Sequence, residues 1–212
     1  GICPLEKIES VDRSLLDSAT VFQTANGNER IYMMPYDADS IMWQLSFPIS
    51  EEAAKALSAQ GAKALKKEAC RRIQWHAPIP QILAATQEAQ VSGYPAYDRA
   101  LLSPELLERA NKSTLIGDAA HPMSPFKGQG ANQALLDALA LARRITKECK
   151  TSSTWKDAGI RKSVLHAFET EMLERSAPKV EHSAEAAALL HSDIILHKGD
   201  GPRGKHRKIE KD

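Results

Sequence analysis

The residues with the clearest chemical potential in this sequence form one continuous loop, Gly117 to Asn132. Asp118 follows a short apolar run, and a strand ending there places a carboxylate where open α/β sheets bind ligands. Gly128-Gln129-Gly130 then leads into a helix, and glycine lets a flat molecule approach the backbone closely. The first turn of a helix presents unpaired N–H groups and a partial positive charge. The loop therefore suits an anion, or a ring that becomes anionic.

Two regular elements must hold this loop in place. Ser113–Ile116 is predicted to be a short buried strand that delivers Asp118. A helix is predicted from about Gln129 to Cys149, and because it is apolar on most sides we expect it to be buried. Its apolar residues are Ala131, Leu135, Leu136, Leu139, Leu141 and Ile145.

The upstream sequence predicts a β-meander followed by helices. The runs Ala19–Thr24, Arg30–Pro35 and Ser40–Phe47 have strand character, and the last alternates apolar and polar residues. Asn26-Gly27 is a hairpin signal, because both residues tolerate positive φ. A helix is predicted from Ser50, as N-cap, to about Ile73, with a break at Gly61. Residues 90–99 look extended, and Ser103-Pro104-Glu105 is typical of another helix start.

The downstream sequence predicts one long helical region and a tail. The helical region runs from about Asp157 to His191, with an apolar stripe of Leu165, Phe168, Met172 and Leu173. Pro178 is expected to kink or split this helix, because proline lacks the N–H that the helix needs. Residues 198–212 are rich in charge and glycine and are predicted to be disordered.

Composition excludes several classes of function. The 212 residues are 42% hydrophobic and 26% charged, with a net charge of +1, so no global field favours nucleic acid. No apolar run approaches the roughly 20 residues that span a bilayer, and the first residues show no signal-peptide pattern. Cys3, Cys70 and Cys149 are odd in number and far apart, which indicates free thiols, a reducing cytoplasmic location and no metal site.

The run from Gly117 to Asp137 resembles the second flavin-binding motif of the FAD-dependent aromatic hydroxylase-type monooxygenases. This family includes p-hydroxybenzoate hydroxylase and the tetracycline-inactivating monooxygenases, and its pattern is Gly-Asp-Ala-Ala-His, a proline-rich loop, then Gly-x-Gly-x-Asn opening a helix. The segment Tyr97-Asp98-Arg99 resembles an Asp-Arg element that often precedes the loop. The resemblance extends over about residues 28–190.

The resemblance implies a role in binding FAD for one set of residues. Asp118 would accept hydrogen bonds from the ribityl chain, and Pro125 would lie beside the isoalloxazine ring. The backbone N–H groups near Gly130 would face the pyrimidine edge and stabilise the negative charge of reduced flavin. The complete set of expected cofactor-binding residues is Gly117, Asp118, Pro125, Gly128, Gln129, Gly130, Ala131 and Asn132.

The sequence departs from the family at its other flavin motifs. No Gly-x-Gly-x-x-Gly unit is present, because Gln133 stands where Gly128-Gln129-Gly130 would require a third glycine. We therefore expect an α+β fragment of an α/β flavoprotein that lacks the N-terminal dinucleotide-binding half. Residues 1–100 would be part of a substrate-binding domain with an antiparallel meander, and 101–150 the strand–loop–helix end of the FAD-binding domain. Residues 151–197 would form a helical region and 198–212 a basic tail.

The implied activity of the parent protein is monooxygenation. FAD would be reduced by NADPH or NADH and would then pass one oxygen atom from O2 to an aromatic or polyketide-like substrate, with no catalytic side chain. His121 is interpreted as a loop-packing residue, since nothing in the loop supplies a partner that would orient it as a base. Alternatives are a related flavin dehydrogenase or halogenase, and a non-catalytic paralogue or fragment that does not hold FAD by itself.

Overall fold

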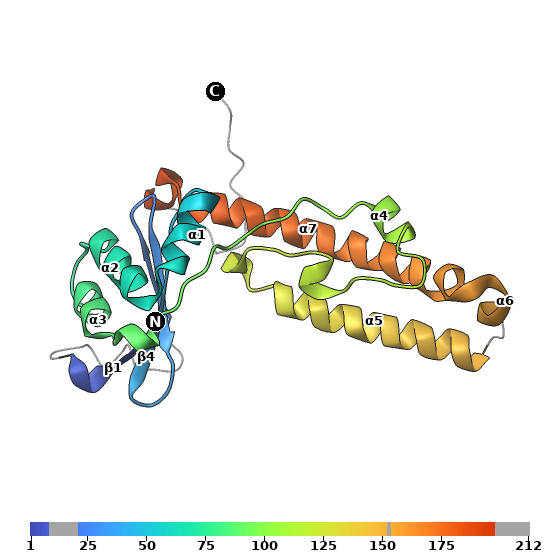
Figure 1. The fold of residues 1–212 in the computed structure, drawn as a ribbon, viewed down its shortest axis with the longest axis horizontal. Helices are drawn as coiled ribbons and strands as arrows, with labels where there is room; N and C mark the ends of the chain where they lie inside the picture. The colour runs from blue at the N-terminus through green and yellow to red at the C-terminus, as the bar shows by residue number, and fades with distance from the viewer. Residues whose placement is uncertain (9–20, 152–153, 198–212) are drawn as a thin grey trace, which may run out of the picture. The chain divides into compact units, whose positions relative to one another are not determined.

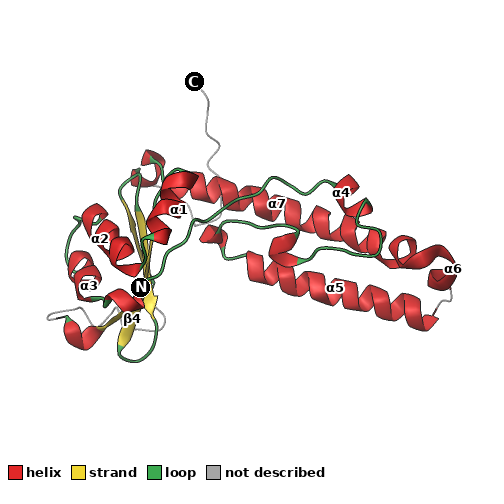
Figure 2. Cartoon of the chain, in the orientation of Figure 1, coloured by secondary structure: helices red, strands yellow, loops and turns green. Residues whose placement is uncertain are grey.

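The computed structural model describes residues 1–8, 21–151 and 154–197, which separate into two compact units (Figure 1). The first unit contains residues 1–93 together with those from Leu189 onward, and the second runs from Tyr94 to Ala188. Every strand of the described residues belongs to the first unit, whereas the regular elements of the second are helical (Figure 2). The predicted tail at 198–212, and the first two residues of the run predicted at 19–24, lie outside the described residues.

The first unit is built on a four-stranded antiparallel sheet. Its strands are β1 (Ile2–Pro4), β2 (Phe22–Ala25), β3 (Arg30–Pro35) and β4 (Ser40–Ser46), in the spatial order β1-β4-β3-β2. The predicted meander is confirmed as β2, β3 and β4. Strand β1 was not predicted, and it pairs with β4 so that Cys3 lies opposite Ile41.

Three helices follow the meander: α1 (Glu51–Ala59), α2 (Ala62–Arg72) and α3 (Ile79–Ala85). The predicted cap is confirmed, because the Ser50 hydroxyl accepts the Ala53 N–H at 3.3 Å. The predicted break is also confirmed, since Gly61 adopts a φ of +80° between α1 and α2. Residues of α2 and α3 complete the core of the first unit against β3 and β4. This core includes Cys3, Ile31, Met33, Ile41, Trp43, Ala69, Ile73, Ile79, Ile82 and Leu83.

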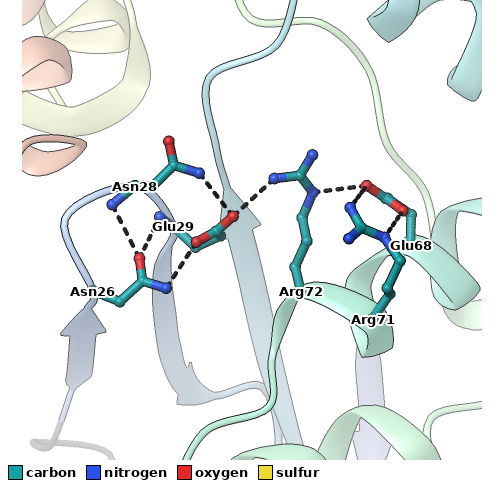
Figure 3. Close-up of polar contacts among 6 residues, drawn as sticks. All are labelled: Asn26, Asn28, Glu29, Glu68, Arg71 and Arg72. Atoms are coloured by element: carbon teal, nitrogen blue, oxygen red, sulfur yellow. Dashed lines mark hydrogen bonds and ion pairs between the residues drawn. The ribbon is translucent and has the colours of Figure 1, made fainter.

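A polar cluster ties α2 to the β2–β3 turn (Figure 3). Glu29 is 8% exposed, and its carboxylate accepts hydrogen bonds from Asn26 and Asn28 at 2.8 Å each. Arg72 donates to Glu29 and to Glu68, again at 2.8 Å each, and its guanidinium lies over the Phe47 ring. Arg72 thus connects the two carboxylates and compensates for the burial of Glu29.

The second unit consists of helices around a small core. They are α4 (Pro104–Glu108), α5 (Gly130–Thr151), α6 (Thr154–Ile160) and α7 (His166–Leu190), with a π-helical turn at Arg161–Leu165 before α7. Helices α5 and α7 run antiparallel, because Asp137 pairs with Arg175 while Arg144, further along α5, pairs with the earlier Glu171. The predicted stripe of α7 is confirmed: Phe168 and Met172 are fully buried with Leu107 and Ala120.

Three expectations for this unit are wrong. Ser113–Ile116 is not a strand: Ile116 has extended dihedral angles, but no strand of the described residues in this unit pairs with it. Helix α5 is not buried on its apolar side, since Leu135 and Leu139 are 69% and 45% exposed. Pro178 does not split α7, which continues through it, and buried residues lie before and after the proline, Met172 and Val180 among them. No helix within the described residues is long and apolar enough to cross a bilayer.

Candidate functional site

The predicted ligand loop folds as two short 3₁₀ turns before α5. Gly117–Ala119 forms the first turn and Pro125–Lys127 the second. Gly128 closes the second turn in the left-handed conformation, at φ +62°, and its N–H donates to the Pro125 carbonyl at 3.0 Å. A residue with a Cβ is strained at such a φ, so glycine is favoured in this approach to α5.

The structure brings the predicted residues together on one open stretch of backbone. A Cβ placed on Gly130 would lie 3.7 Å from the Asp118 Oδ1 atom, so the carboxylate stands close to the start of α5. A Cβ placed on Gly128 would meet nothing within 4 Å. Gly117 is buried and Gln129 and Gly130 are partly buried. The remaining predicted residues are exposed, namely Asp118, Pro125, Gly128, Ala131 and Asn132.

These groups could bind a ligand of a particular kind. The N–H groups in the first turn of α5 have no partner inside the helix, and the helix dipole adds partial positive charge there. Asp118 supplies acceptors at the adjoining position, and ionised carboxylates accept hydrogen bonds from hydroxyl groups. A flat molecule that carries hydroxyls at one side and develops negative charge at the other fits both sets of groups. FAD has these features, so the residues present fit this cofactor.

The buried carboxylate of Asp137 in α5 accepts hydrogen bonds from the loop. Its Oδ2 atom accepts the Gly117 N–H at 2.8 Å and the His121 Nε2–H at 2.7 Å. Its Oδ1 atom accepts from Arg175 of α7 at 2.8 Å. Arg175 also donates to the side-chain Oε1 atom of Gln133 at 3.1 Å. Asp137 is 0% exposed, so the carboxylate at the centre of this network is shielded from water, whereas Arg175 is 22% exposed.

The charge on Asp137 is maintained by these contacts. Burial raises the pKa of Asp137, but the Gly117 N–H, the Arg175 guanidinium and the His121 ring together lower this pKa below its ordinary value. The carboxylate is therefore ionised at neutral pH, and it can only accept hydrogen bonds. It consequently selects the His121 form that carries a proton on Nε2.

His121 is a buried packing residue, as predicted, but it has an orienting partner outside the loop. Its ring is 4% exposed and lines a cavity of about 120 Å³ with apolar side chains such as Leu102 and Leu173. Its Nδ1 atom has no hydrogen-bond partner within the described residues.

The Asp-Arg segment supports the loop from a third side. The Asp98 carboxylate accepts the Ser124 N–H at 2.7 Å, and the Ser124 hydroxyl donates to the Ser183 carbonyl of α7 at 2.8 Å. Asp98 therefore acts as an acceptor for the loop backbone. Arg99 is exposed.

Sequence reasoning missed Gln133, Asp137 and Arg175 as supports of the loop. One signal was available, because Asp137 is the single acid in the apolar stretch from Ala134 to Ala142. A charge inside such a stretch needs a partner if it is buried. The partner, Arg175, is 38 residues away in α7, and no local pattern points to it. No cluster of three or more metal-ligating side chains occurs among the described residues.

A family model described as FAD binding domain matches residues 22–157 of this chain. The aurachin C monooxygenase/isomerase of Stigmatella aurantiaca is 42% identical over 76 residues, which cover 36% of this chain and 19% of that protein. The FAD-dependent monooxygenase phnB of Penicillium herquei is 37% identical over 83 residues, which cover 39% and 19%.

The fold has counterparts among solved structures. Klebsiella pneumoniae HpxO, complexed with FAD and uric acid, superposes with a TM-score of 0.60 at 18% sequence identity. The match covers 92% of this chain and 44% of HpxO. The chain thus corresponds to less than half of that structure, and to about a fifth of the two curated relatives.

Proposed function

We propose that this chain, which belongs to the FAD binding domain family, is the flavin-loop portion of an FAD-dependent monooxygenase. The parent enzyme would insert one oxygen atom from O2 into a small aromatic or polyketide-like substrate. NADPH or NADH would supply two electrons, and the second oxygen atom would leave as water. The observation that carries this proposal is the adjacency of Asp118 to the open first turn of α5.

The chain's own residues bind and orient the cofactor in this proposal. The Asp118 carboxylate accepts hydrogen bonds from the ribityl hydroxyls. The N–H groups of Gly130, Ala131 and Asn132 face the ring edge that becomes negative on reduction, and preorganised donors of this kind stabilise developing charge. The chemistry that bound FAD would supply is hydride acceptance and reaction with O2. No side chain of the loop is assigned a proton transfer to substrate.

The proposal also assigns a place within the parent protein. Residues 1–100 would belong to the substrate-binding domain, 101–150 to the end of the FAD-binding domain and 151–197 to a helical region. The exposed apolar side of α5, with Leu135 at 69% and Leu139 at 45%, supports a larger protein, because large exposed apolar patches are rare on complete domains. Alone, the 212 residues would hold FAD weakly, since they lack a dinucleotide-binding glycine motif.

A comparison of two proteins tests the function. FAD is titrated into the 212-residue chain and into the full-length protein that contains it, and flavin fluorescence is followed. We expect tight binding only by the full-length protein. Asp118→Ala in that protein should weaken binding roughly tenfold, the effect of losing about one hydrogen bond to a charged group. Lys112→Ala, an exposed residue outside the loop, is the control.

The reaction itself is tested with isotopic oxygen. The FAD-loaded protein is supplied with NADPH or NADH, ¹⁸O2 and a panel of phenols and polyketide-like aromatics. Monooxygenation predicts one ¹⁸O atom in the product for each nicotinamide oxidised. Nicotinamide oxidation without oxygen in any product would favour a dehydrogenase, and a full-length protein without bound FAD would refute the proposal.

A further inference from the structure

The buried carboxylate of Asp137 receives donors from three separate parts of the second unit. Gly117 contributes a backbone N–H from the start of the loop, and His121 contributes its ring from just after the first turn. Arg175 contributes a guanidinium from α7. One side chain thus joins the loop backbone, a loop side chain and a neighbouring helix.

The contacts of Asp137 bear on both halves of the candidate flavin site. Gly117 immediately precedes Asp118, so fixing the Gly117 N–H fixes the point from which the Asp118 side chain extends. Gly117 is also close to α5, because a Cβ placed on it would lie 3.1 Å from the Ala134 Cβ. On the helix side, Arg175 spans Gln133 and Asp137, and Gln133 lies one turn after Gly130. The same network therefore bears on the position of the Asp118 carboxylate and on the position of the first turn of α5.

Stability alone does not require a charge at this position. A buried ion pair often contributes less to stability than apolar residues of similar volume, because both charges lose their hydration. The core of the same unit shows that apolar packing is available, since Phe168 and Met172 are fully buried nearby on α7. What an apolar residue could not do is receive three donors at fixed positions.

We propose that Asp137 is a positioning residue for the flavin site, which sets the separation between the Asp118 carboxylate and the first turn of α5. This inference rests on the proposed function. Arg175 has the companion role of fixing the carboxylate relative to α7. Neither residue needs to touch the cofactor.

Three substitutions divide the network. Asp137→Asn retains one acceptor oxygen: if that oxygen faces the loop, the amide NH2 faces Arg175, and two donors oppose each other. Asp137→Leu keeps a similar volume and removes every acceptor. Arg175→Met keeps a long apolar side chain at this position and leaves the hydrogen bonds between Asp137 and the loop intact. Arg175 is 22% exposed, so its head group is already partly in contact with solvent. FAD affinity of the full-length protein should fall severalfold for Arg175→Met, roughly tenfold for Asp137→Asn and roughly a hundredfold for Asp137→Leu.

Two controls separate positioning from general stability. Met172→Ala creates a cavity in the core of the same unit, in the cluster that includes Ala120 of the loop, but removes none of the hydrogen bonds to Asp137. Arg144→Gln breaks the exposed Arg144–Glu171 pair, which joins the same two helices. If Asp137 positions the flavin site, Asp137→Asn should lower FAD affinity at least fivefold more than Met172→Ala at matched loss of melting temperature. Arg144→Gln should leave the affinity unchanged.

A second readout does not involve flavin. Amide hydrogen exchange in the 212-residue chain should become at least tenfold faster at Gly117 in Asp137→Leu, which removes the acceptor of this N–H, while the Phe168 amide of the core keeps its rate. An unchanged Gly117 rate overturns the proposal, even if the full-length protein proves not to bind FAD and the proposed function fails. Equal loss of FAD affinity in Asp137→Asn and Met172→Ala also overturns it, because the role is then structural. If Asp137→Asn does not fold, Arg175→Met decides by FAD affinity: a loss no larger than that of Met172→Ala at matched loss of melting temperature overturns the proposal.

Discussion

Glu68 of the first unit should make its stability depend on pH in the acid range. The carboxylate accepts hydrogen bonds from Arg71 and from Arg72, both at under 3 Å (Figure 3). The hydrogen bond from Arg71 has the largest effect and the one from Arg72 a smaller one. Together they outweigh burial and lower the pKa of Glu68 to about 2. Because the folded-state pKa lies below the ordinary value, the ionised form stabilises the fold above pH 4.5. That contribution is lost as the pH falls towards about 2.

The size of the effect follows from the shift and the exposure. A lowering from 4.5 to about 2 sets an upper bound of about 3 kcal/mol. The side chain of Arg71 is 64% exposed, so solvent screens its interaction with Glu68. The side chains of Arg72 and Glu68 are 16% and 21% exposed, so the interaction between these two is screened less. After this discount we expect Glu68→Gln to lower the free energy of unfolding by about 1–2 kcal/mol at pH 7.

The assay is urea unfolding of the first unit, with tryptophan fluorescence as the readout. Trp155→Phe removes the tryptophan of the second unit, so that Trp43 and Trp75 report. The difference between parent and Glu68→Gln should shrink between pH 5 and pH 2. Glu51→Gln, in the exposed Glu51–Lys55 pair, is the matched control and should change the free energy by about 0.5 kcal/mol or less. A difference that stays constant down to pH 2 would refute the reasoning.

Two further substitutions are informative. Thr86→Val removes the hydroxyl that accepts the buried Trp43 indole N–H at 2.9 Å. Thr86→Val should lower the free energy of unfolding of the first unit by about 1–3 kcal/mol. Thr86→Ser keeps the hydroxyl and should retain most of the parent's free energy of unfolding in the same urea assay. Asp98→Ala removes the acceptor of the Ser124 N–H and should lower FAD affinity of the full-length protein severalfold by fluorescence titration. Asp98→Asn keeps a carbonyl oxygen there, and affinity near the parent value is expected; equal losses in both variants would contradict this role.

The sequence predicted those elements whose cause is local. Alternation in Ser40–Phe47 and the Asn26-Gly27 signal predicted the meander, and Gly61 predicted the break between α1 and α2. Strand β1 was missed because three residues, Ile2–Pro4, become a strand only through pairing with β4. The supports of the loop were missed for the same reason, since Asp137 and Arg175 meet only when α5 and α7 pack together.

The burial of α5 was predicted wrongly for an instructive reason. Periodicity identifies which side of a helix is apolar, but it does not say whether anything covers that side. In α5 the sides are reversed relative to an ordinary surface helix. Gln133 and Asp137, one turn apart, are buried against the loop and α7, while Leu135 and Leu139, also one turn apart, are exposed. The polar contacts of this helix therefore help to orient it, beside the packing of Ala140 and Leu141 against the core. Asp137 joins this helix to the loop through Gly117 and His121, beside the separate support of Ser124 by Asp98, and for this reason we expect a conservative change at Asp137 to matter more than the loss of a core methionine.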